Sequence, residues 1–304
     1  MFSAIVSANN PRVKHALQLK ESRARRREKL FLIDGVREVE RAWRSGYEFV
    51  EVFWDAGKDV EAECKVNLDA SLRNVCHDAE RRGKLKEILT LSDSKRTPTI
   101  PLASGAFAKI VFGDRNEGVV AVVKSKLTTL DELDSLLEEK CRTSREEPLI
   151  GVVEGVEKPG NIGAILRSAD GAGLDAIMIA ADDYDVYNPN AVRGSLGAIF
   201  HVPVVVASSA TLLTWLRERR IQRATALCDE AIPYAQLDYR LPTAVVLGSE
   251  AEGLTKEWSE ETQVDMDNNL LRKIRLPMLG VADSLNVSNA AAILFYEARR
   301  VRSY

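Results

Sequence analysis

The sequence predicts an α/β protein with two domains, and three observations lead to this fold class. The chain has 304 residues, of which 45% are hydrophobic, which is enough for two packed cores. In both halves, short apolar runs alternate with amphipathic stretches, a pattern typical of strands that helices cover. Between the halves, residues 125–148 hold one charged amphipathic helix and a polar tail. We interpret this segment as a linker between a domain over residues 1–124 and a domain over residues 149–304.

The first half predicts a small sheet with helical cover. The run "KLFLIDG" is a buried strand, and the helix that follows it ends at Gly46, because glycine favours helix ends. Further apolar runs follow, bounded by polar residues. The predicted elements are strands over 29–35, 48–56, 87–92 and 118–124, and a polar helix over roughly 70–83.

The second half predicts a parallel sheet. Its apolar runs are nearly continuous, as in strands whose two faces are both buried by helices. In such folds ligands bind beyond the carboxyl ends of the strands, so we expect functional residues there. The predicted strands cover 149–156, 176–180, 202–206, 224–228 and 244–249.

Charge separates one short segment from the rest of the chain. The whole chain carries a formal net charge of −3, which does not indicate a nucleic-acid binder. Between Arg12 and Lys29, eight basic residues stand against two acidic ones, which gives a local charge of +6 (8 − 2). Such a run is either a solvated helix face or a contact with phosphate groups.

Cysteine and histidine are few and scattered. The four cysteines contain no C-x-x-C pair, and the three histidines are equally far apart, so we expect neither a metal site nor a disulfide framework. This usage favours a reducing cytoplasm. No apolar run approaches the roughly 20 residues of a membrane span, and the N-terminus lacks a signal-peptide pattern. We therefore expect a cytoplasmic protein without a membrane segment.

A glycine-rich stretch follows the first strand of the second half. In "VEKPGNIGAILRSADG", Gly160 and Gly163 allow a tight turn, Asn161 suits the start of a helix, and Arg167 lies one turn further on. With acidic residues at 182–183, the stretch is similar to the dinucleotide-binding loop of a nicotinamide-dependent oxidoreductase. The G-x-G-x-x-G spacing is absent, which argues against that function. A glycine turn with a surface arginine is the structural alternative.

Two further stretches place polar groups after strands. In "AVVLGSEAEGL", Gly248 and Gly253 allow a ligand to approach the main chain, and Glu250 stands between them. In "IRLPMLGVADSLNVSNAAA", strand 274–277 ends at a proline, and a helix begins with more polar residues than one N-cap needs. Taken alone, these are also compatible with a plain strand-to-helix turn and an elaborate helix cap. The polar residues at that helix start are Ser284, Asn286, Ser288 and Asn289.

Together, the three stretches resemble the motifs of one enzyme family. N-x-G-x-x-x-R, L-G-S-E-x-E-G and P-M-x-G-x-x-x-S-L-N-V-S occur in this order, as in the SpoU/TrmH family of SPOUT RNA ribose 2′-O-methyltransferases. The resemblance covers the chain from residue 149 onward. In the first half, "IVSANNPRVKHALQLK" and "RRREKLFLIDGVREVERA" resemble the L30e-like RNA-binding domain that precedes the catalytic domain in many members.

This resemblance implies a fold, an assembly and a cofactor. The fold is a parallel sheet whose C-terminal segment threads a deep trefoil knot, which periodicity could not indicate because knots are very rare. Members are homodimers whose catalytic pocket is completed across the interface. They bind S-adenosylmethionine in the knot, largely through main-chain groups. The cofactor-binding residues implied for this chain are Ala226, Leu247, Gly248, Gly253, Leu276, Met278, Ser284, Leu285 and Asn286.

The resemblance also implies a catalytic site without a metal. Arg167 is its centre, and Asn161, Glu250, Ser284 and Asn286 support it. Arginine is a weak candidate for a free base, because its pKa normally exceeds about 12. We therefore expect Arg167 to bind a substrate phosphate and the 2′-oxygen and to stabilise developing negative charge. The phosphate or a buried guanidinium would then accept the proton.

The expected partner is RNA. We favour rRNA, because an N-terminal domain of this type is commoner among relatives that modify rRNA. The alternatives are methylation of tRNA and, from another class, a non-catalytic RNA-binding or ribosome-assembly protein. Many members carry Asp-Pro where this chain has Lys158-Pro159, so Lys158 either contacts phosphate or is tolerated in a variable loop. The RNA-binding candidates are Arg12, Lys14, Arg25, Arg26, Arg27 and Lys158.

Overall fold

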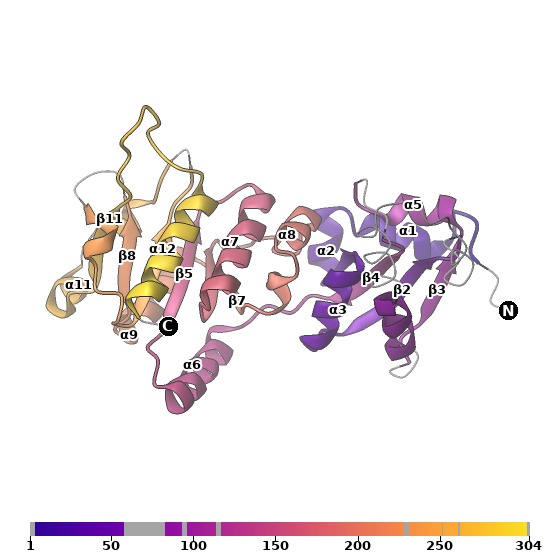
Figure 1. Ribbon diagram of the computed structural model, residues 1–304, viewed down its shortest axis with the longest axis horizontal. Coiled ribbons are helices and arrows are strands. Elements are labelled where there is room, and N and C mark those ends of the chain that lie inside the picture. The colour runs from indigo at the N-terminus through magenta and orange to yellow at the C-terminus, as the bar shows by residue number, and fades with distance from the viewer. Residues whose placement is uncertain are drawn as a thin grey trace, which may run out of the picture. The chain divides into compact units, whose positions relative to one another are not determined.

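The chain forms two compact units, each with its own sheet (Figure 1). The computed structural model describes residues 4–57, 83–92, 96–113, 117–227, 231–250, 252–260 and 262–302. Unit 1 comprises Met1–Lys126 and Tyr187–Arg193, and unit 2 comprises Leu127–Val186 and Gly194–Tyr304.

Unit 1 contains a four-stranded mixed sheet in the order β1-β4-β2-β3. Strand β4 pairs antiparallel with both β1 and β2, whereas β2 and β3 are parallel. Pro101 lies in β3, at the edge of the sheet, where a residue without an N–H is tolerated. The strands are β1 (Leu30–Asp34), β2 (Phe49–Asp55), β3 (Thr99–Leu102) and β4 (Val119–Lys124).

Four helices with defined bounds belong to the N-terminal part of unit 1. Asn10 caps the first of them, since its side chain accepts a hydrogen bond from the Arg12 N–H, and Pro11 occupies the first helical position. Buried Val13 and Phe107 help to pack α1 and α5 into one core. These helices are α1 (Pro11–Gln18), α2 (Ser22–Glu28), α3 (Val36–Arg44) and α5 (Ser104–Ile110).

One predicted strand of the first half is wrong. Residues 83–92 are helical, including the stretch 87–92 that we expected to be a strand. Leu85, Ile88 and Ser92 are buried, and their spacing of three and four residues is that of a helix face. A short apolar run does not distinguish a strand from a buried helix segment. Of the helix expected over 70–83, residues 70–82 lie outside the described part of the chain.

Unit 2 contains a seven-stranded sheet in the order β7-β6-β5-β10-β8-β11-β9, and all its pairings are parallel. Every residue of β5, β6 and β10 is buried, which confirms the expected α/β fold with a parallel sheet. The strands are β5 (Leu149–Glu154), β6 (Ala176–Ala180), β7 (Val204–Ala207), β8 (Gln222–Ala226), β9 (Ile232–Pro233), β10 (Thr243–Leu247) and β11 (Leu271–Arg275).

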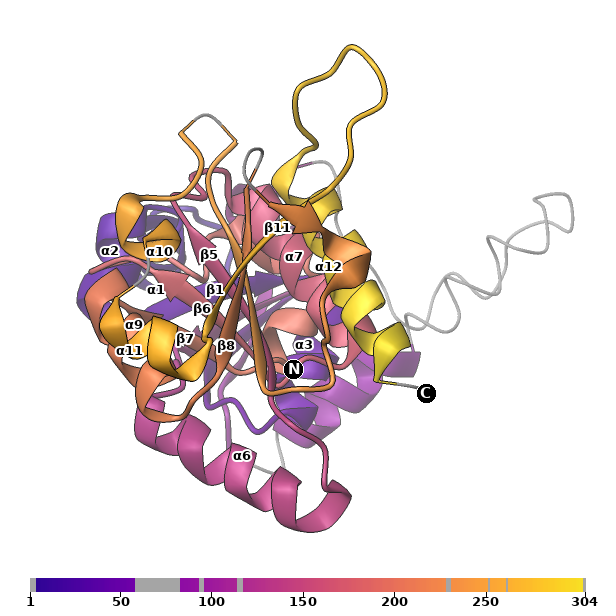
Figure 2. The same ribbon diagram turned by 90° about the vertical axis from the view of Figure 1, so that its left-hand side faces the viewer.

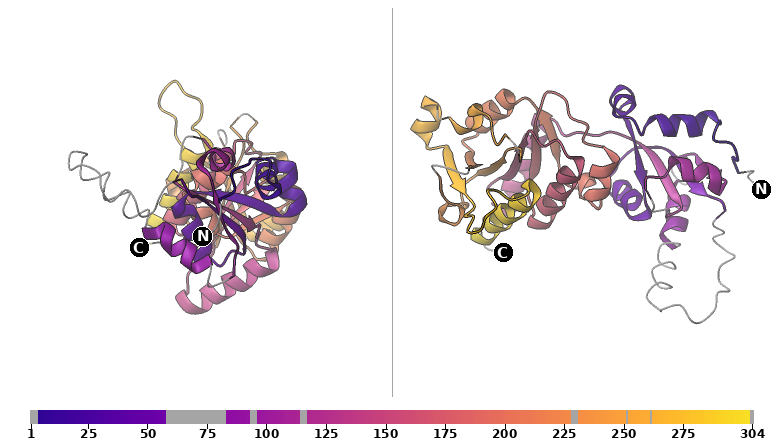
Figure 3. Two further views of the ribbon diagram at one scale, coloured as in Figure 1. Left: turned by 90° about the vertical axis from the view of Figure 1, so that its right-hand side faces the viewer. Right: turned by 90° about the horizontal axis from the view of Figure 1, so that it is seen from above.

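Helices cover both faces of this sheet (Figure 2). Helices α7 and α12 lie on one face, and α9, α10 and α11 lie on the other. Figures 1 and 3 show α7 and α12 side by side. The helices of unit 2 are α6 (Leu130–Ser144), α7 (Pro159–Ala172), α9 (Ser209–Glu218), α10 (Lys256–Ser259), α11 (Gln263–Asn268) and α12 (Val287–Val301), with 3₁₀ turns η2 (Ala198–Phe200) and η3 (Tyr234–Gln236). Helix α8 (Pro189–Gly194) belongs to unit 1 except for its last residue.

Strand β11 occupies an unusual place in the order. Strands β8 and β9 follow one another in the chain, yet β11 lies between them in the sheet. Ile274 is paired with Ala226 on one side and with Ile232 on the other. Strand β11 therefore lies between two strands that both precede it in sequence and that are consecutive in the chain.

Candidate active site

Residues from the three sequence motifs meet at one carboxylate. The Oε1 atom of Glu250 accepts hydrogen bonds from Asn161 Nδ2 (3.1 Å), from Asn286 Nδ2 and from the Val287 N–H (3.3 Å). Asn286 Nδ2 also donates to Asn161 Oδ1 (3.2 Å). We call Asn161, Glu250 and Asn286 the motif cluster. It joins side chains that lie up to 125 residues apart in the chain.

The fold explains why these side chains meet. Asn161 is in the first turn of α7, just after β5, and Glu250 follows β10. Since β5 and β10 are parallel neighbours, their carboxyl ends lie at the same edge. Asn286 is the N-cap of α12, and its Oδ1 accepts hydrogen bonds from the N–H and the hydroxyl of Ser288. The polar residues at this helix start therefore both cap the helix and bind Glu250.

Glu250 is held as an anion. The hydrogen bond from the Val287 N–H lowers the pKa of Glu250, and the nearby Lys158 ammonium and Asn161 amide lower it further. Lys158 Nζ lies 3.5 Å from Oε2, the carboxylate oxygen that the motif cluster leaves open. An ionised carboxylate accepts hydrogen bonds but has none to donate. Glu250 is therefore suited to fixing donors and not to acting as an acid.

A buried carboxylate that we did not predict supports the loop after β10. Glu154, at the end of β5, accepts hydrogen bonds from the Thr255 N–H (2.8 Å), Thr255 Oγ1 (3.0 Å), Ser209 Oγ (2.8 Å) and Trp258 Nε1 (3.0 Å). The available signal was an acidic residue that closes an otherwise apolar strand, "LIGVVE". Glu154 thereby ties the segment after Glu250 to β5.

The glycines of the second motif form a tight turn. The Ser249 N–H donates to the Gly253 carbonyl (3.0 Å), and the Gly253 N–H donates to the Ser249 carbonyl (3.1 Å). A Cβ on Gly248 would lie 2.2 Å from the carbonyl carbon of Gly253, so only glycine fits there. Gly253 has φ +71°, and a Cβ on it would meet no atom within 4 Å. The space beside Gly253 is therefore open on one side of the turn.

The expected cofactor residues lie at the same edge of the sheet. Ala226 ends β8, Leu247 ends β10, and Leu276 directly follows β11, and these three strands are adjacent. Met278 and Leu285 lie in the connection from β11 to α12, which Figure 2 shows extending away from the sheet. The structure thus places the ends of three strands side by side, whereas the connection that carries Met278 and Leu285 extends beyond them.

Two expected catalytic residues are not in contact with the motif cluster. Ser284 is exposed, and its side chain has no hydrogen bond to any residue that the structure describes. Arg167 is exposed as well, without a side-chain hydrogen bond or ion pair to the described residues. It follows Asn161 by six residues, which turns it about 240° around α7. Arg167 is therefore on a different face of α7 from Asn161.

The RNA-binding candidates of the first half divide into two kinds. Arg12, Lys14, Arg26 and Arg27 are exposed on α1 and α2. Arg25 is buried, and its guanidinium donates to the carbonyls of Leu19 (2.8 Å) and Lys20 (2.5 Å) in the turn between these helices. A buried guanidinium that caps carbonyls is not available to phosphate, so the expectation for Arg25 needs correction.

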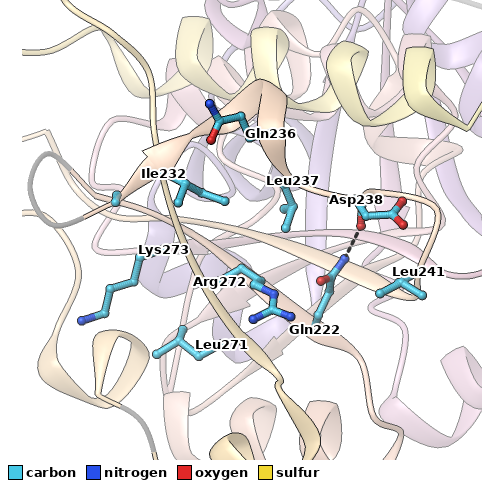
Figure 4. A pocket seen from close by; sticks show the side chains of 10 residues that line it. Gln222, Ile232, Gln236, Leu237, Asp238, Leu241, Leu271, Arg272 and Lys273 are labelled. Atoms are coloured by element: carbon cyan, nitrogen blue, oxygen red, sulfur yellow. Dashed lines mark hydrogen bonds between the residues drawn. The ribbon is translucent and has the colours of Figure 1, made fainter.

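An open pocket in unit 2 lies elsewhere. It has a volume of about 770 Å³ and lies beside β8, β11 and residues 231–241 (Figure 4). Gln222 and Leu271, which line it, begin their strands, and Gln222 Nε2 donates to the Asp238 carbonyl (2.8 Å). None of the predicted site residues lines this pocket.

Two kinds of feature are absent from the described ranges. They contain no group of three or more histidine, cysteine, aspartate or glutamate side chains placed to hold a metal ion. They also contain no helix of sufficient length and hydropathy to cross a membrane.

Family models and relatives match both halves of the chain. The model for the SpoU rRNA Methylase family matches residues 148–296, and that for the MRM3-like substrate binding domain matches residues 10–121. The 23S rRNA (uridine(2479)-2′-O)-methyltransferase of Streptomyces viridochromogenes is 31% identical over 76% of this chain and 77% of its own. The 23S rRNA (guanosine(2553)-2′-O)-methyltransferase RlmP of Bacillus subtilis is 26% identical over 97% and 98%.

A solved structure shows the same fold. The SpoU methyltransferase AviRb from Streptomyces viridochromogenes, in complex with the cofactor AdoMet, matches with a TM-score of 0.76 at 26% identity. The match covers 97% of this chain and 98% of that one.

Proposed function

Because the chain belongs to the SpoU rRNA methylase family, we propose that it transfers a methyl group from S-adenosylmethionine to a ribose 2′-hydroxyl of 23S rRNA in the cytoplasm. The observation that carries this proposal is the motif cluster, in which one residue from each motif meets the others at Glu250. Relatives that match most of the chain are named as 23S rRNA 2′-O-methyltransferases, which favours rRNA over tRNA.

The edge formed by β10, β8 and β11 fits the cofactor. The open space beside Gly253 leaves room for a ligand against the main chain of this turn. Ala226 and Leu247 end their strands, Leu276 directly follows the strand between β8 and β9, and all three would contribute main-chain groups. When bound, S-adenosylmethionine supplies an electrophilic methyl group. The residues that would hold it are Ala226, Leu247, Gly248, Gly253, Leu276, Met278, Ser284, Leu285 and Asn286.

The insertion of β11 supports the predicted knot. In a knot, a late segment of the chain passes through a loop formed by earlier segments. Strand β11 fits this description, because it lies between β8 and β9, which are both part of the chain before β10. We propose that the segment from 276 to 287 completes the knot and carries its cofactor-binding groups next to the motif cluster.

The position of Arg167 supports a homodimer. A Cβ on Gly171, one turn after Arg167, would lie 2.7 Å from Tyr296 Oη, so this face of α7 adjoins α12. Ile293 and Tyr296 on α12 are 39% and 46% exposed. We propose that a second copy covers this face and that Arg167 thereby reaches the partner's motif cluster.

In this arrangement, Arg167 acts on the ribose. Its guanidinium would bind a substrate phosphate and the 2′-oxygen and stabilise the negative charge that develops there. The motif cluster would fix the first turns of α7 and α12, which hold the reactants in line.

The proposed RNA surface lies on unit 1. The exposed residues Arg12, Lys14, Arg26 and Arg27 would neutralise phosphates, and Lys158 would do so beside the motif cluster. The match of the substrate-binding model to residues 10–121 agrees with this role.

The test is methyl transfer from labelled S-adenosylmethionine to purified rRNA and tRNA, with Arg167→Ala alongside. We expect label in 23S rRNA, lost in the variant while the cofactor still binds. Label in tRNA alone would overturn the RNA class. Cofactor binding without transfer to free rRNA, tRNA or ribosomal subunits would instead support a binding protein.

A further inference from the structure

Helix α7 carries two charged side chains in its fourteen residues, and they are close together. They are Arg167 and Asp170, three positions apart. Residues at this spacing share a helix face, with Cβ atoms about 5–6 Å apart. The remaining polar surface of α7 consists of small or uncharged residues. The charged side chains of α7 are therefore confined to one face, which is the face that can bind charged or polar groups.

Asp170 binds a histidine there. Its Oδ1 lies 2.6 Å from Nδ1 of His201. His201 follows η2, whose residues Ala198–Phe200 are buried and pack against α7. The main-chain N–H of His201 donates to the Ala198 carbonyl (2.9 Å), which fixes the backbone at this point. The imidazole is therefore anchored at one nitrogen, while 79% of its side-chain surface remains exposed.

This anchoring defines the chemistry of the ring. An ionised carboxylate only accepts hydrogen bonds, so Nδ1 carries the hydrogen. In neutral His201 the other nitrogen, Nε2, then has a free lone pair that points away from Asp170. A carboxylate at Nδ1 also stabilises the imidazolium that forms when Nε2 takes a proton. The charged residues of α7, the helix packed against its turn, are Asp170, which contacts His201, and Arg167, three positions before Asp170.

We propose that His201 is the general base for the ribose 2′-hydroxyl and that Asp170 is its positioning residue. This inference rests on the proposed function and on Arg167 as the residue that contacts the ribose. The 2′-oxygen forms a bond to the methyl carbon while the carbon–sulfur bond breaks and its electron pair stays on sulfur. The 2′-hydroxyl proton passes to Nε2 of His201. Arg167 and His201 then divide the work, since one stabilises charge and the other removes the proton.

A purely structural role for this pair makes a different prediction. In that case the Asp170–His201 bond would only hold η2 against α7. His201→Asn separates the two roles, because the asparagine amide places an N–H near the position of Nδ1 but has no counterpart of Nε2. For a general base we expect kcat to fall about 10²- to 10⁴-fold, with a much smaller change in KM for RNA. Unchanged kcat would overturn the proposal.

The pH profile provides a second test. A base must be unprotonated, so in the wild type kcat falls as the solution is acidified below the histidine range, near pH 6–7 for ordinary histidines. In His201→Asn this acidic limb should disappear, and in Asp170→Asn kcat should fall while a limb remains. A limb that persists unchanged in His201→Asn would belong to another group and contradict the assignment.

A third readout does not depend on turnover. The chain has three histidines, so ¹⁵N-histidine NMR spectra of the full chain contain three side-chain sets, and the one missing from His201→Asn is His201. We expect hydrogen at Nδ1, loss of that tautomer in Asp170→Asn, and a shift of the Nε2 signal when RNA is added without cofactor. An Nε2–H tautomer, or no response to RNA at saturation, would overturn the proposal.

His15 provides the matched control. Its Nε2 lies 2.7 Å from Glu28 Oε2, so it is also paired with a carboxylate, but it belongs to unit 1. His15→Asn should keep kcat at saturating RNA. Comparison of the wild type with His201→Asn distinguishes failure of the proposed function from failure of this inference. If the wild type transfers no methyl group, the proposed function fails and this inference falls with it. If it does, and His201→Asn does so equally well, only this inference fails.

Discussion

The carboxylate of Glu154 accepts a hydrogen bond from the indole N–H of Trp258, which lies 104 residues further along the chain (3.0 Å). Trp258 is fully buried, and Thr255 beside it donates twice to the same carboxylate. These hydrogen bonds hold the segment after Glu250 against the end of β5. The geometry of the motif cluster thus depends on a residue that belongs to none of the three motifs.

Replacing Glu154 by Gln should destabilise unit 2. The amide nitrogen cannot accept, so at least one of the four donors would lose its partner in a buried place, at a cost of about 1–3 kcal/mol. We expect a lower midpoint in urea and weaker cofactor binding, measured by calorimetry. Glu257→Gln, at an exposed position on α10, is the control and should change stability by less than about 0.5 kcal/mol. Equal midpoints for the two variants would contradict this account.

Arg25 and Arg26 are adjacent but should behave differently. Arg25→Ala removes the donor to the carbonyls of Leu19 and Lys20 and should lower the unfolding free energy by about 1–3 kcal/mol. Arg26→Ala, on the exposed side of α2, should lower stability less than Arg25→Ala does and should weaken RNA binding. Its plot of log K against log salt should be shallower by about one. RNA titrations at several salt concentrations check this. A larger loss of RNA affinity in folded Arg25→Ala than in Arg26→Ala would show that Arg25 contacts RNA after all.

Asp34 should make unit 1 less stable as the pH rises. Burial raises the pKa of its carboxyl to about 6, although the Phe112 N–H and Arg193 act in the opposite direction. The folded state therefore binds this proton more tightly than the unfolded state, whose pKa is about 3.9. The contribution to stability is present below pH 4, is lost as the pH rises to about 6, and stays absent above it.

The variant Asp34→Asn tests this assignment. Its amide oxygen can still accept from the Phe112 N–H (2.8 Å in the wild type), and no charge is buried. Relative to the wild type, its unfolding free energy in urea should rise by about 1–3 kcal/mol between pH 4 and pH 7.5. A constant difference across this range would show that Asp34 does not titrate there.

Lys158 should affect RNA binding more than stability. Its ammonium is 76% exposed and lies 3.5 Å from Glu250 Oε2, and such exposed pairs contribute little to folding. Lys158→Ala should leave the urea midpoint unchanged and reduce the salt slope of RNA binding by about one. Lys256→Ala, an exposed lysine on α10, is the control. If both variants bind RNA like the wild type, Lys158 belongs to a tolerated loop.

The strands of unit 2 were predictable because both of their faces are buried, which leaves nearly continuous apolar runs such as β6. Strand β11 was less visible: it begins at Leu271, before the expected 274, because basic residues interrupt its apolar pattern. The stretch 83–92 misled us because helices and strands share short apolar runs.

The site residues also divide into those that the sequence predicts and those that it does not. Asn161, Glu250 and Asn286 stand in recognisable motifs, so they could be found without a structure. The contacts of Glu154 and His201 could not be predicted, because their partners Trp258 and Asp170 are distant in sequence and no local spacing encodes them. For Glu154, an acidic residue at the end of an apolar strand was the only signal. The burial of Arg25 was also hidden, since it stands among exposed basic residues.

The place of β11 between β8 and β9 has a consequence for protein synthesis. Until residue 275 has left the ribosome, β8 presents an edge of unpaired N–H and C=O groups that pairs readily with other chains. The nascent chain therefore carries this aggregation hazard until β11 has been made, which happens only after every other strand of the sheet. A stop codon just before β11 would leave β8 without its partner on one side. We expect that truncated product to be insoluble rather than partly active.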